Sequence, residues 1–268
     1  MSALRIAIPL LLISQSTQLQ AIEFSATAIQ SVPGRADVST HLYYSSGRIR
    51  KEFFYHGEPV IQILDANKHI SLMCFTEQQV CYENKSLEEI NIGIEQAQNS
   101  PCDGNKKLLC ENLGEEVLNG RKAVHWKIGT RPKKVVKKDK KTIVNAEAKA
   151  QKVSFQWLDS ALGIPVKIVS FNGARSDLIW LGSEIVNNRK TEKWQQLIKP
   201  VNGNKLESTV WFDTELKISI KQAFANGNSQ ELRQIVVEKL SNKLFTLPVG
   251  FEKQVIGKRV SNKKSNIQ

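Results

Sequence analysis

The sequence lacks both the long apolar runs of helical membrane proteins and the biased composition of disordered or fibrous chains. Its 268 residues are 41% hydrophobic, 24% charged and 7% aromatic, which is an ordinary globular balance. This composition excludes an intrinsically disordered or collagen-like chain. Because no run approaches the roughly 20 apolar residues of a membrane-spanning helix, a protein with several such helices is excluded as well. The length suits one large or two small domains.

Motifs of the common catalytic classes are also missing. The sequence contains no G-x-S-x-G nucleophile elbow, no H-E-x-x-H zinc motif and no P-loop. It has no C-x-x-C spacing, and its four histidines are scattered along the chain at His41, His56, His69 and His125. We therefore predict a protein that is not an enzyme, with no metal and no cofactor.

Two aspartates, Asp159 and Asp213, are the nearest approach to a pair of catalytic carboxylates. Each stands just before a turn, where an aspartate commonly accepts hydrogen bonds from the backbone N–H groups that follow. We interpret both as turn-capping residues. The five tryptophans are interpreted in the same way, as core residues of a curved sheet rather than as sugar-binding platforms.

The N-terminal segment has the layout of a secretory signal peptide. Arg5 is a short basic region, Ile6–Ile13 is an apolar run, and Leu19-Gln20-Ala21 precedes a predicted cleavage after Ala21. The alternative is an uncleaved anchor, although the run is far shorter than a bilayer span. We predict a periplasmic protein with residues 1–21 as its signal peptide.

Four cysteines agree with export, because disulfides persist in oxidising compartments. Three pairings are possible. We favour Cys74–Cys81 and Cys102–Cys110, because each pair flanks a local turn. The alternative is a metal site that combines the cysteines with His69, and the spacing does not favour it.

Positive charge is in excess, with 38 Lys and Arg against 26 Asp and Glu and a net charge of +12. Much of it lies in a polar insertion, Pro132–Lys152, and in a basic tail at 259–268 that we expect to be disordered. The lysine cluster of the insertion consists of Lys133, Lys134, Lys137, Lys138, Lys140 and Lys141. This cluster is either a solvated loop or a site of attraction to an anionic membrane surface. It has no interleaved aromatic residues, so nucleic acid is not an expected partner.

Most of the chain predicts antiparallel strands. Short runs with alternating or β-branched residues recur at about ten-residue spacing, and Gly, Pro, Asn and Asp separate them. The predicted strands include Glu23–Gln30, Asp37–Tyr44, Arg48–Tyr55, Val60–Leu64, His69–Phe75, Gly114–Val117 and Arg121–Ile128. The residues His56 to Pro59 and Asn119-Gly120 are expected to be turns. The pattern indicates a mainly β fold, a curved antiparallel sheet rather than βαβ units.

One segment, Ser86–Gln98, departs from this pattern. It begins with a capping box and places Leu87, Ile90 and Ile94 on one face at helical spacing. We predict an amphipathic helix over the sheet. It either covers the core or forms a lid over an apolar cavity.

The C-terminal half contains an internal repeat. When Trp157–Asn188 is shifted by 54 residues onto Trp211–Asn242, ten of 32 positions carry the same residue. Each copy predicts strand, turn, strand, Asn-Gly turn and strand, so either a duplicated three-strand unit or convergent hairpin chemistry accounts for it.

Several short stretches together resemble the LolA-like superfamily, including its uncharacterised periplasmic branches. They are Gly47–Glu52, Val60–Asp65, Val80–Asn84, Leu113–Arg121 with Trp126, and Leu247–Phe251. The resemblance implies an unclosed β-barrel with covering helices, and an apolar concavity that carries or senses acyl chains. It also implies a role for Arg50, which lies near the place where such carriers have an arginine. The lysine-rich insertion, the disulfides and the longer C-terminal half depart from the carriers.

Two functions follow from these observations. The first is a non-enzymatic periplasmic binder of a lipid or acylated protein, with Leu87, Ile90, Ile94 and Arg50 at the ligand. The second is an envelope interaction or scaffold protein with a filled barrel, which binds an anionic surface or a partner through its lysine cluster. In both, residues 22–258 form a single LolA-like β domain with the insertion at about 132–152.

Overall fold

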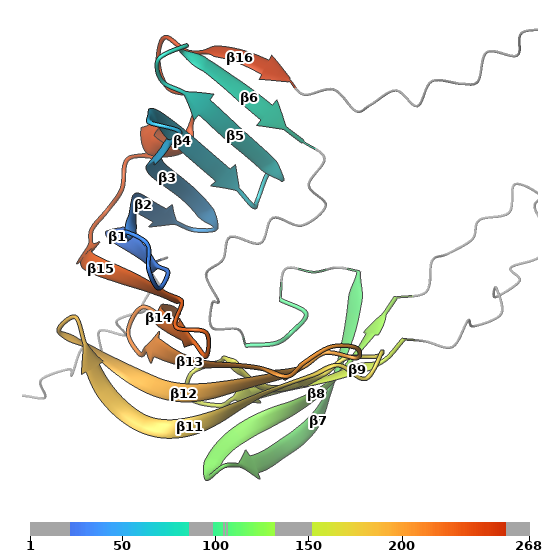
Figure 1. The fold of residues 1–268 in the computed structure, drawn as a ribbon. Helices are drawn as coiled ribbons and strands as arrows, with labels where there is room; N and C mark the ends of the chain where they lie inside the picture. The colour runs from blue at the N-terminus through green and yellow to red at the C-terminus, as the bar shows by residue number, and fades with distance from the viewer. Residues whose placement is uncertain (1–21, 86–98, 104, 106, 132–151, 256–268) are drawn as a thin grey trace, which may run out of the picture.

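The computed structural model describes residues 22–85, 99–103, 105, 107–131 and 152–255. These residues form one sheet of 16 strands, and their only helical element is a 3₁₀ turn, η1 (Asn242–Phe245) (Figure 1). The predicted mainly β, curved and unclosed sheet is therefore confirmed. Within the described ranges, no helix is long and apolar enough to cross a membrane. The predicted helix Ser86–Gln98 lies outside the described residues, as do residues 1–21 and the lysine cluster.

The strands follow the predicted runs closely. The first six are β1 (Glu23–Ser31), β2 (Val38–Ser45), β3 (Arg48–Tyr55), β4 (Glu58–Asp65), β5 (Ile70–Phe75) and β6 (Val80–Asn84). The next nine are β7 (Leu108–Leu118), β8 (Arg121–Thr130), β9 (Ser154–Asp159), β10 (Pro165–Val169), β11 (Arg175–Val186), β12 (Arg189–Lys199), β13 (Leu206–Asp213), β14 (Ile218–Phe224) and β15 (Ser229–Val237). After η1, the chain ends its described part with β16 (Glu252–Val255).

The sheet consists of two meanders joined in the middle. Its strand order is β16-β6-β5-β4-β3-β2-β1-β15-β14-β13-β12-β11-β10-β9-β8-β7. The first strand, β1, therefore pairs with β15, which is near the C-terminal end of the sequence. We call β1 to β6 with β16 the N wing, and β7 to β15 the C wing. Neighbouring strands are antiparallel throughout, except that β16 lies parallel to β6.

The sheet bends around β1, β15 and β14, so the two wings stand at an angle and border a concave side (Figure 1). Three clusters of buried side chains hold this shape. The first lies at the junction of the wings and contains Phe24, Tyr44, Ile49 and Ile218. The second belongs to the C wing, and the third lies on the outer face of the N wing, where Leu240 and Phe245 cover it.

Two-residue turns connect several of the hairpins. Asn119 and Gly120 have φ angles of 51° and 78°, as a type I′ turn requires, and the predicted hairpin is confirmed. The predicted turn from His56 to Pro59 is too long. Only His56 and Gly57 take left-handed angles, 52° and 84°, and Pro59 already lies opposite Phe54 in the β3–β4 ladder.

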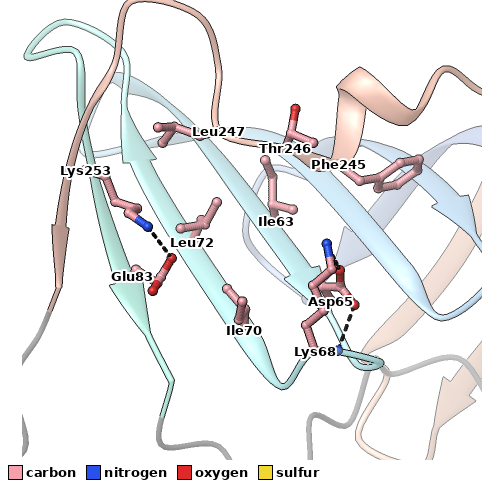
Figure 2. A pocket seen from close by; sticks show the side chains of 10 residues that line it. All are labelled: Ile63, Asp65, Lys68, Ile70, Leu72, Glu83, Phe245, Thr246, Leu247 and Lys253. Carbon is pink, nitrogen blue, oxygen red and sulfur yellow. Dashed lines mark hydrogen bonds and ion pairs between the residues drawn. The ribbon is translucent and has the colours of Figure 1, made fainter.

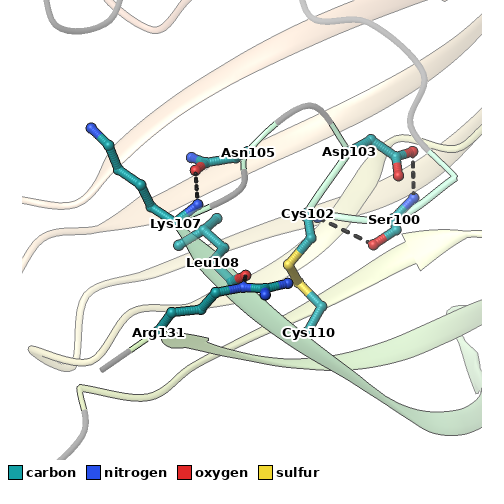
Figure 3. Close-up of a disulfide and its surroundings, with 8 residues drawn as sticks. All are labelled: Ser100, Cys102, Asp103, Asn105, Lys107, Leu108, Cys110 and Arg131. Carbon is teal, nitrogen blue, oxygen red and sulfur yellow. Dashed lines mark hydrogen bonds between the residues drawn. A yellow bond between two sulfur atoms is a disulfide. The ribbon is translucent and has the colours of Figure 1, made fainter. Parts of the chain in front are cut away.

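Both disulfides have the predicted pairing. Cys74 and Cys81 lie directly opposite each other on β5 and β6, and both are fully buried. Cys102 and Cys110 tie the loop before β7 to that strand (Figure 3). In this loop, the Asp103 carboxylate accepts a hydrogen bond from the Ser100 backbone N–H at 3.0 Å. The second disulfide therefore anchors a short, turn-rich loop at the outer strand of the C wing.

The internal repeat is visible as two equivalent units, β9–β11 and β13–β15, each built as strand, turn, strand, turn and strand. Asp159 and Asp213 occupy equal places in them. One carboxylate oxygen of each accepts the backbone N–H groups two and three residues on, at 3.0 and 2.9 Å for Asp159 and at 2.9 and 2.8 Å for Asp213. Arg121 pairs with Asp159, and Arg189 with Asp213. The turn-capping interpretation is therefore confirmed.

Candidate functional site

A hollow of about 520 Å³ lies on the concave side, where the two wings meet. Its lining comes from β1, β2 and β3 in the N wing and from β11 to β15 in the C wing. This volume falls within the range of about 300–1,000 Å³ that is typical of small-molecule sites. The bend of the sheet is therefore what creates the candidate site.

Much of the lining is apolar. Leu42, Leu178, Val210 and Ile220 each reach the hollow while remaining largely buried, with 1–8% of their surface exposed. They stand on four different strands, β2, β11, β13 and β14, and alternation along each strand turns them inward. These side chains offer an apolar molecule a surface to which it can bind.

A small polar cluster lies among these residues. Gln196 and Ser208 lie opposite each other on β12 and β13, and the Ser208 hydroxyl donates to the Gln196 side-chain oxygen at 2.9 Å. The Gln222 amide donates to both residues, at 3.2 and 3.1 Å. The polar atoms of the cluster thus largely satisfy one another.

Lys51 is the basic residue that the N wing contributes to the hollow. It stands on β3 between Leu42 of β2 and Gln62 of β4, and its side chain is half-buried. Burial lowers the pKa of Lys51 from its usual value, because the charged amine loses water contacts. No ion pair of Lys51 is found among the described residues. By contrast, Lys221 on β14 lies 4.0 Å from a Glu231 carboxylate oxygen.

Arg50, expected at the ligand, lies on the opposite face of β3. Its guanidinium contacts Glu52 at 2.6 Å and donates to the Leu244 carbonyl oxygen at 3.3 Å. The side chain is only 12% exposed, because the segment around η1 covers it. Consecutive strand residues point to opposite faces, so the hollow receives Lys51 in place of Arg50.

The other residues predicted at the ligand, Leu87, Ile90 and Ile94, lie outside the described residues, and their role as a lid stays a prediction. The same holds for the lysine cluster. Sequence reasoning missed Lys51, Gln196 and Gln222. Strand alternation shows which residues share a face, but not which face of the sheet becomes concave.

A smaller pocket of about 220 Å³ lies on the outer face of the N wing (Figure 2). Ile63, Leu72, Phe245 and Leu247 form part of its apolar lining, and the chain around η1 passes over it. Glu83 lies at its rim. Hydrogen bonds from Lys85 and Lys253 hold the pKa of Glu83 below its usual value. The pocket is small, and the chain's own C-terminal segment, which contains η1, covers it.

One contact resembles an acid–base pair and has a structural explanation. His125 Nδ1 lies 2.8 Å from a Glu116 carboxylate oxygen, and its ring stacks on Trp157 with centroids 4.1 Å apart. Trp157 Nε1 donates to the same carboxylate at 3.0 Å. The repeat has the same arrangement in Glu184, Lys193 and Trp211. Lys193 stands in the second arrangement where His125 stands in the first, so acid–base chemistry of a histidine is not common to the two. What they share is a glutamate and a basic side chain that hold a tryptophan in place. Among the described residues, no group of three or more acidic, histidine or cysteine side chains could hold a metal ion.

The chain was compared with known proteins. No family model matches it, and no curated protein matches it. Among solved structures it is similar to a LolA superfamily protein from Nitrosomonas europaea, at 7% identity over 85% of this chain and 90% of that chain, with a TM-score of 0.36. It is also similar to an outer membrane lipoprotein-sorting protein domain from Vibrio parahaemolyticus, at 10% identity over 84% and 89%, with a TM-score of 0.31. The MucA/MucB complex of Pseudomonas aeruginosa matches at 10% identity over 82% and 94%, with a TM-score of 0.19. The identities leave the function to be argued from this chain's own geometry.

Proposed function

We propose that this chain is an exported, non-enzymatic binding protein that holds a lipid, or the acyl chain of an acylated protein, in the hollow between its wings. The observation that carries the proposal is the hollow itself, where both wings contribute apolar side chains to a lining that is about half apolar and half polar. Each Å² of apolar ligand surface removed from water contributes about 25 cal/mol, so an acyl chain has a clear driving force to enter.

Two further features support the proposal. The signal-peptide layout and the paired cysteines both fit an oxidising compartment such as the periplasm. The lid role of Leu87, Ile90 and Ile94, which lie outside the described residues, remains part of the proposal. The resemblance to LolA-like carriers points to the same class of ligand.

The test measures ligand binding directly. Gently extracted protein is analysed by mass spectrometry for co-purifying lipid, and purified protein is titrated with a fluorescent fatty acid. We expect both to detect a ligand. A variant that narrows the hollow, Ala28→Trp, should lower the affinity at least about tenfold. The matched control, Val249→Trp, introduces the same side chain at a fully exposed position and should have no effect. If neither co-purifying lipid nor probe uptake is found, the proposal fails.

The alternative, an envelope scaffold that acts through its lysine cluster, has its own test. Residues 132–151 connect two neighbouring antiparallel strands, β8 and β9, whose register pairs Ile128 with Ser154. They can therefore be replaced by a short turn without breaking the sheet. Loss of binding to anionic vesicles, with fatty-acid uptake intact, would favour the scaffold function of this segment.

A further inference from the structure

We propose that the ligand of the hollow is a single-chain amphiphile with an oxyanion at its polar end, and that Lys51 is the counter-ion of this group. The inference rests on the proposed function, because it names the chemistry of the molecule that the same hollow would bind. It assigns a charge and an orientation to that molecule.

The first argument is the position of Lys51. The residue stands in the middle of β3, opposite Leu42 and Gln62, and its side chain points into the hollow. A lysine at the edge of a protein can extend its amine fully into water, but here the side chain as a whole is half-buried among the residues of the hollow. Burial without an opposite charge is unfavourable, and the lowered pKa of Lys51 reflects that loss of hydration. A bound anion would compensate for it.

The second argument is the balance of charge in the hollow. Three charged residues line it, namely Lys51, Lys221 and Glu231. Glu231 accepts contacts from Lys221 at 4.0 Å and from Arg233 at 2.8 Å, so its carboxylate is already engaged. The lining thus carries two cations and one anion, and Lys51 is the cation that has no carboxylate within ion-pair distance among the described residues. The hollow therefore favours one negative charge over none.

The third argument comes from the polar side chains. The Ser208 hydroxyl and the Gln222 amide both donate within their own cluster. Neither the Gln196 amide N–H groups nor the Lys51 amine has a hydrogen-bond partner among the described residues, and Lys51 is the stronger of these donors because it is charged. Charge-assisted hydrogen bonds to an amine are roughly twice as strong as neutral ones. The oxyanion is thus expected at Lys51, and the chain against Leu42, Leu178 and Val210.

The test compares ligands that differ only at the polar end. Oleate and oleyl alcohol share one chain, and only oleate carries the charge. We expect the wild-type protein to bind oleate at least about tenfold more tightly than oleyl alcohol, as measured by displacement of a fluorescent fatty acid. In Lys51→Met this preference should disappear, because the affinity for oleate falls while the affinity for oleyl alcohol stays unchanged. Lys51→Arg keeps the positive charge and should retain the preference for oleate. That result would show that the effect of Lys51→Met comes from the lost charge and not from a change in folding.

Lys190→Met removes an exposed lysine that does not line the hollow, and it should leave both affinities unchanged. Equal binding of oleate and oleyl alcohol by the wild type, or an unchanged preference in Lys51→Met, would overturn the counter-ion role while leaving the carrier function intact. Failure of both ligands to bind would instead overturn the proposed function. A third ligand, oleoyl lysophosphatidylglycerol, separates the sources of the oxyanion, because tighter binding than oleate would assign a phosphate headgroup.

Discussion

Removal of the Asp213 carboxylate is expected to be the most destabilising polar substitution in the C wing. The side chain is 1% exposed. It accepts the backbone N–H groups of Glu215 and Leu216 at 2.9 and 2.8 Å, and it pairs with Arg189. In Asp213→Ala, one buried and one partly buried N–H group and a guanidinium lose their acceptor together. Breaking a buried ion pair in this way costs about 3–5 kcal/mol.

Other contacts place Asp213→Ala at the lower end of this range. Arg189 also contacts Glu215 at 3.0 Å, so the guanidinium keeps one carboxylate. We therefore expect a loss of about 3 kcal/mol in the free energy of unfolding. Asp213→Asn keeps an oxygen for the turn and loses only the charge, so about 1–2 kcal/mol is expected. Asp159→Ala should match Asp213→Ala within about 1 kcal/mol, because the same contacts surround both aspartates.

The assay is urea denaturation with the disulfides intact, followed by tryptophan fluorescence. The matched control is Asp177→Ala, whose partner Arg175 lies 3.8 Å away on the surface. Exposed pairs contribute less than about 1 kcal/mol, so this variant should unfold almost like the wild type. If Asp213→Ala also unfolds within about 1 kcal/mol of the wild type, the aspartate does not hold the turn and the reasoning is refuted.

Three further predictions concern the disulfides, the acidity of the medium and the outer face. Replacing Cys102 and Cys110 by serine opens a loop with a sequence separation of 8, and chain entropy predicts a loss of about 2–3 kcal/mol in urea denaturation; a smaller loss than about 1 kcal/mol would contradict it. The pKa of Glu83 is held below its usual value, so its stabilising contribution is complete above the pKa of a glutamate in the unfolded chain, about 4.3, and is lost as the pH falls through the lower folded-state pKa. Urea midpoints between about pH 3 and 7 should therefore fall less steeply in Glu83→Gln, and identical slopes would argue against this ion pair. Phe245 is only 5% exposed, so Phe245→Ala should lower the free energy of unfolding by about 3 kcal/mol and speed amide hydrogen exchange around η1. Val249 is fully exposed, so Val249→Ala should change neither quantity. Equal exchange rates in the two variants would refute the covering role of Phe245.

The sequence-based predictions succeeded where the signal is local. The Asn119-Gly120 hairpin, the caps at Asp159 and Asp213, and both disulfides depend on residues a few positions apart, and all agree with the structure. The presence of strands was predictable for the same reason, because apolar and polar residues alternate with a period of two within each segment.

Features that depend on distant segments could not be predicted. Nothing near Glu23–Ser31 indicates that this strand pairs with Ser229–Val237, nor that β16 lies parallel on β6. The face of β3 that borders the hollow could not be predicted for a related reason. Both residues fit the alternation of β3, and only the bend of the whole sheet decides which of them faces the hollow.

The junction between β1 and β15 has a consequence for the order of folding. It joins residues about 200 positions apart, from Ser31 opposite Ser229 to Phe24 opposite Val237, and the hydrogen bond from Ser25 to Glu238 spans 213 residues at 2.7 Å. The N wing can therefore form its hairpins early, but the edge of β1 stays open until almost the entire polypeptide has been synthesised. Closure over so long a loop is slow, because its entropy must be lost before the contacts form. During that interval the unpaired edge of β1 is exposed to aggregation, and a folding helper would have its longest time to act there.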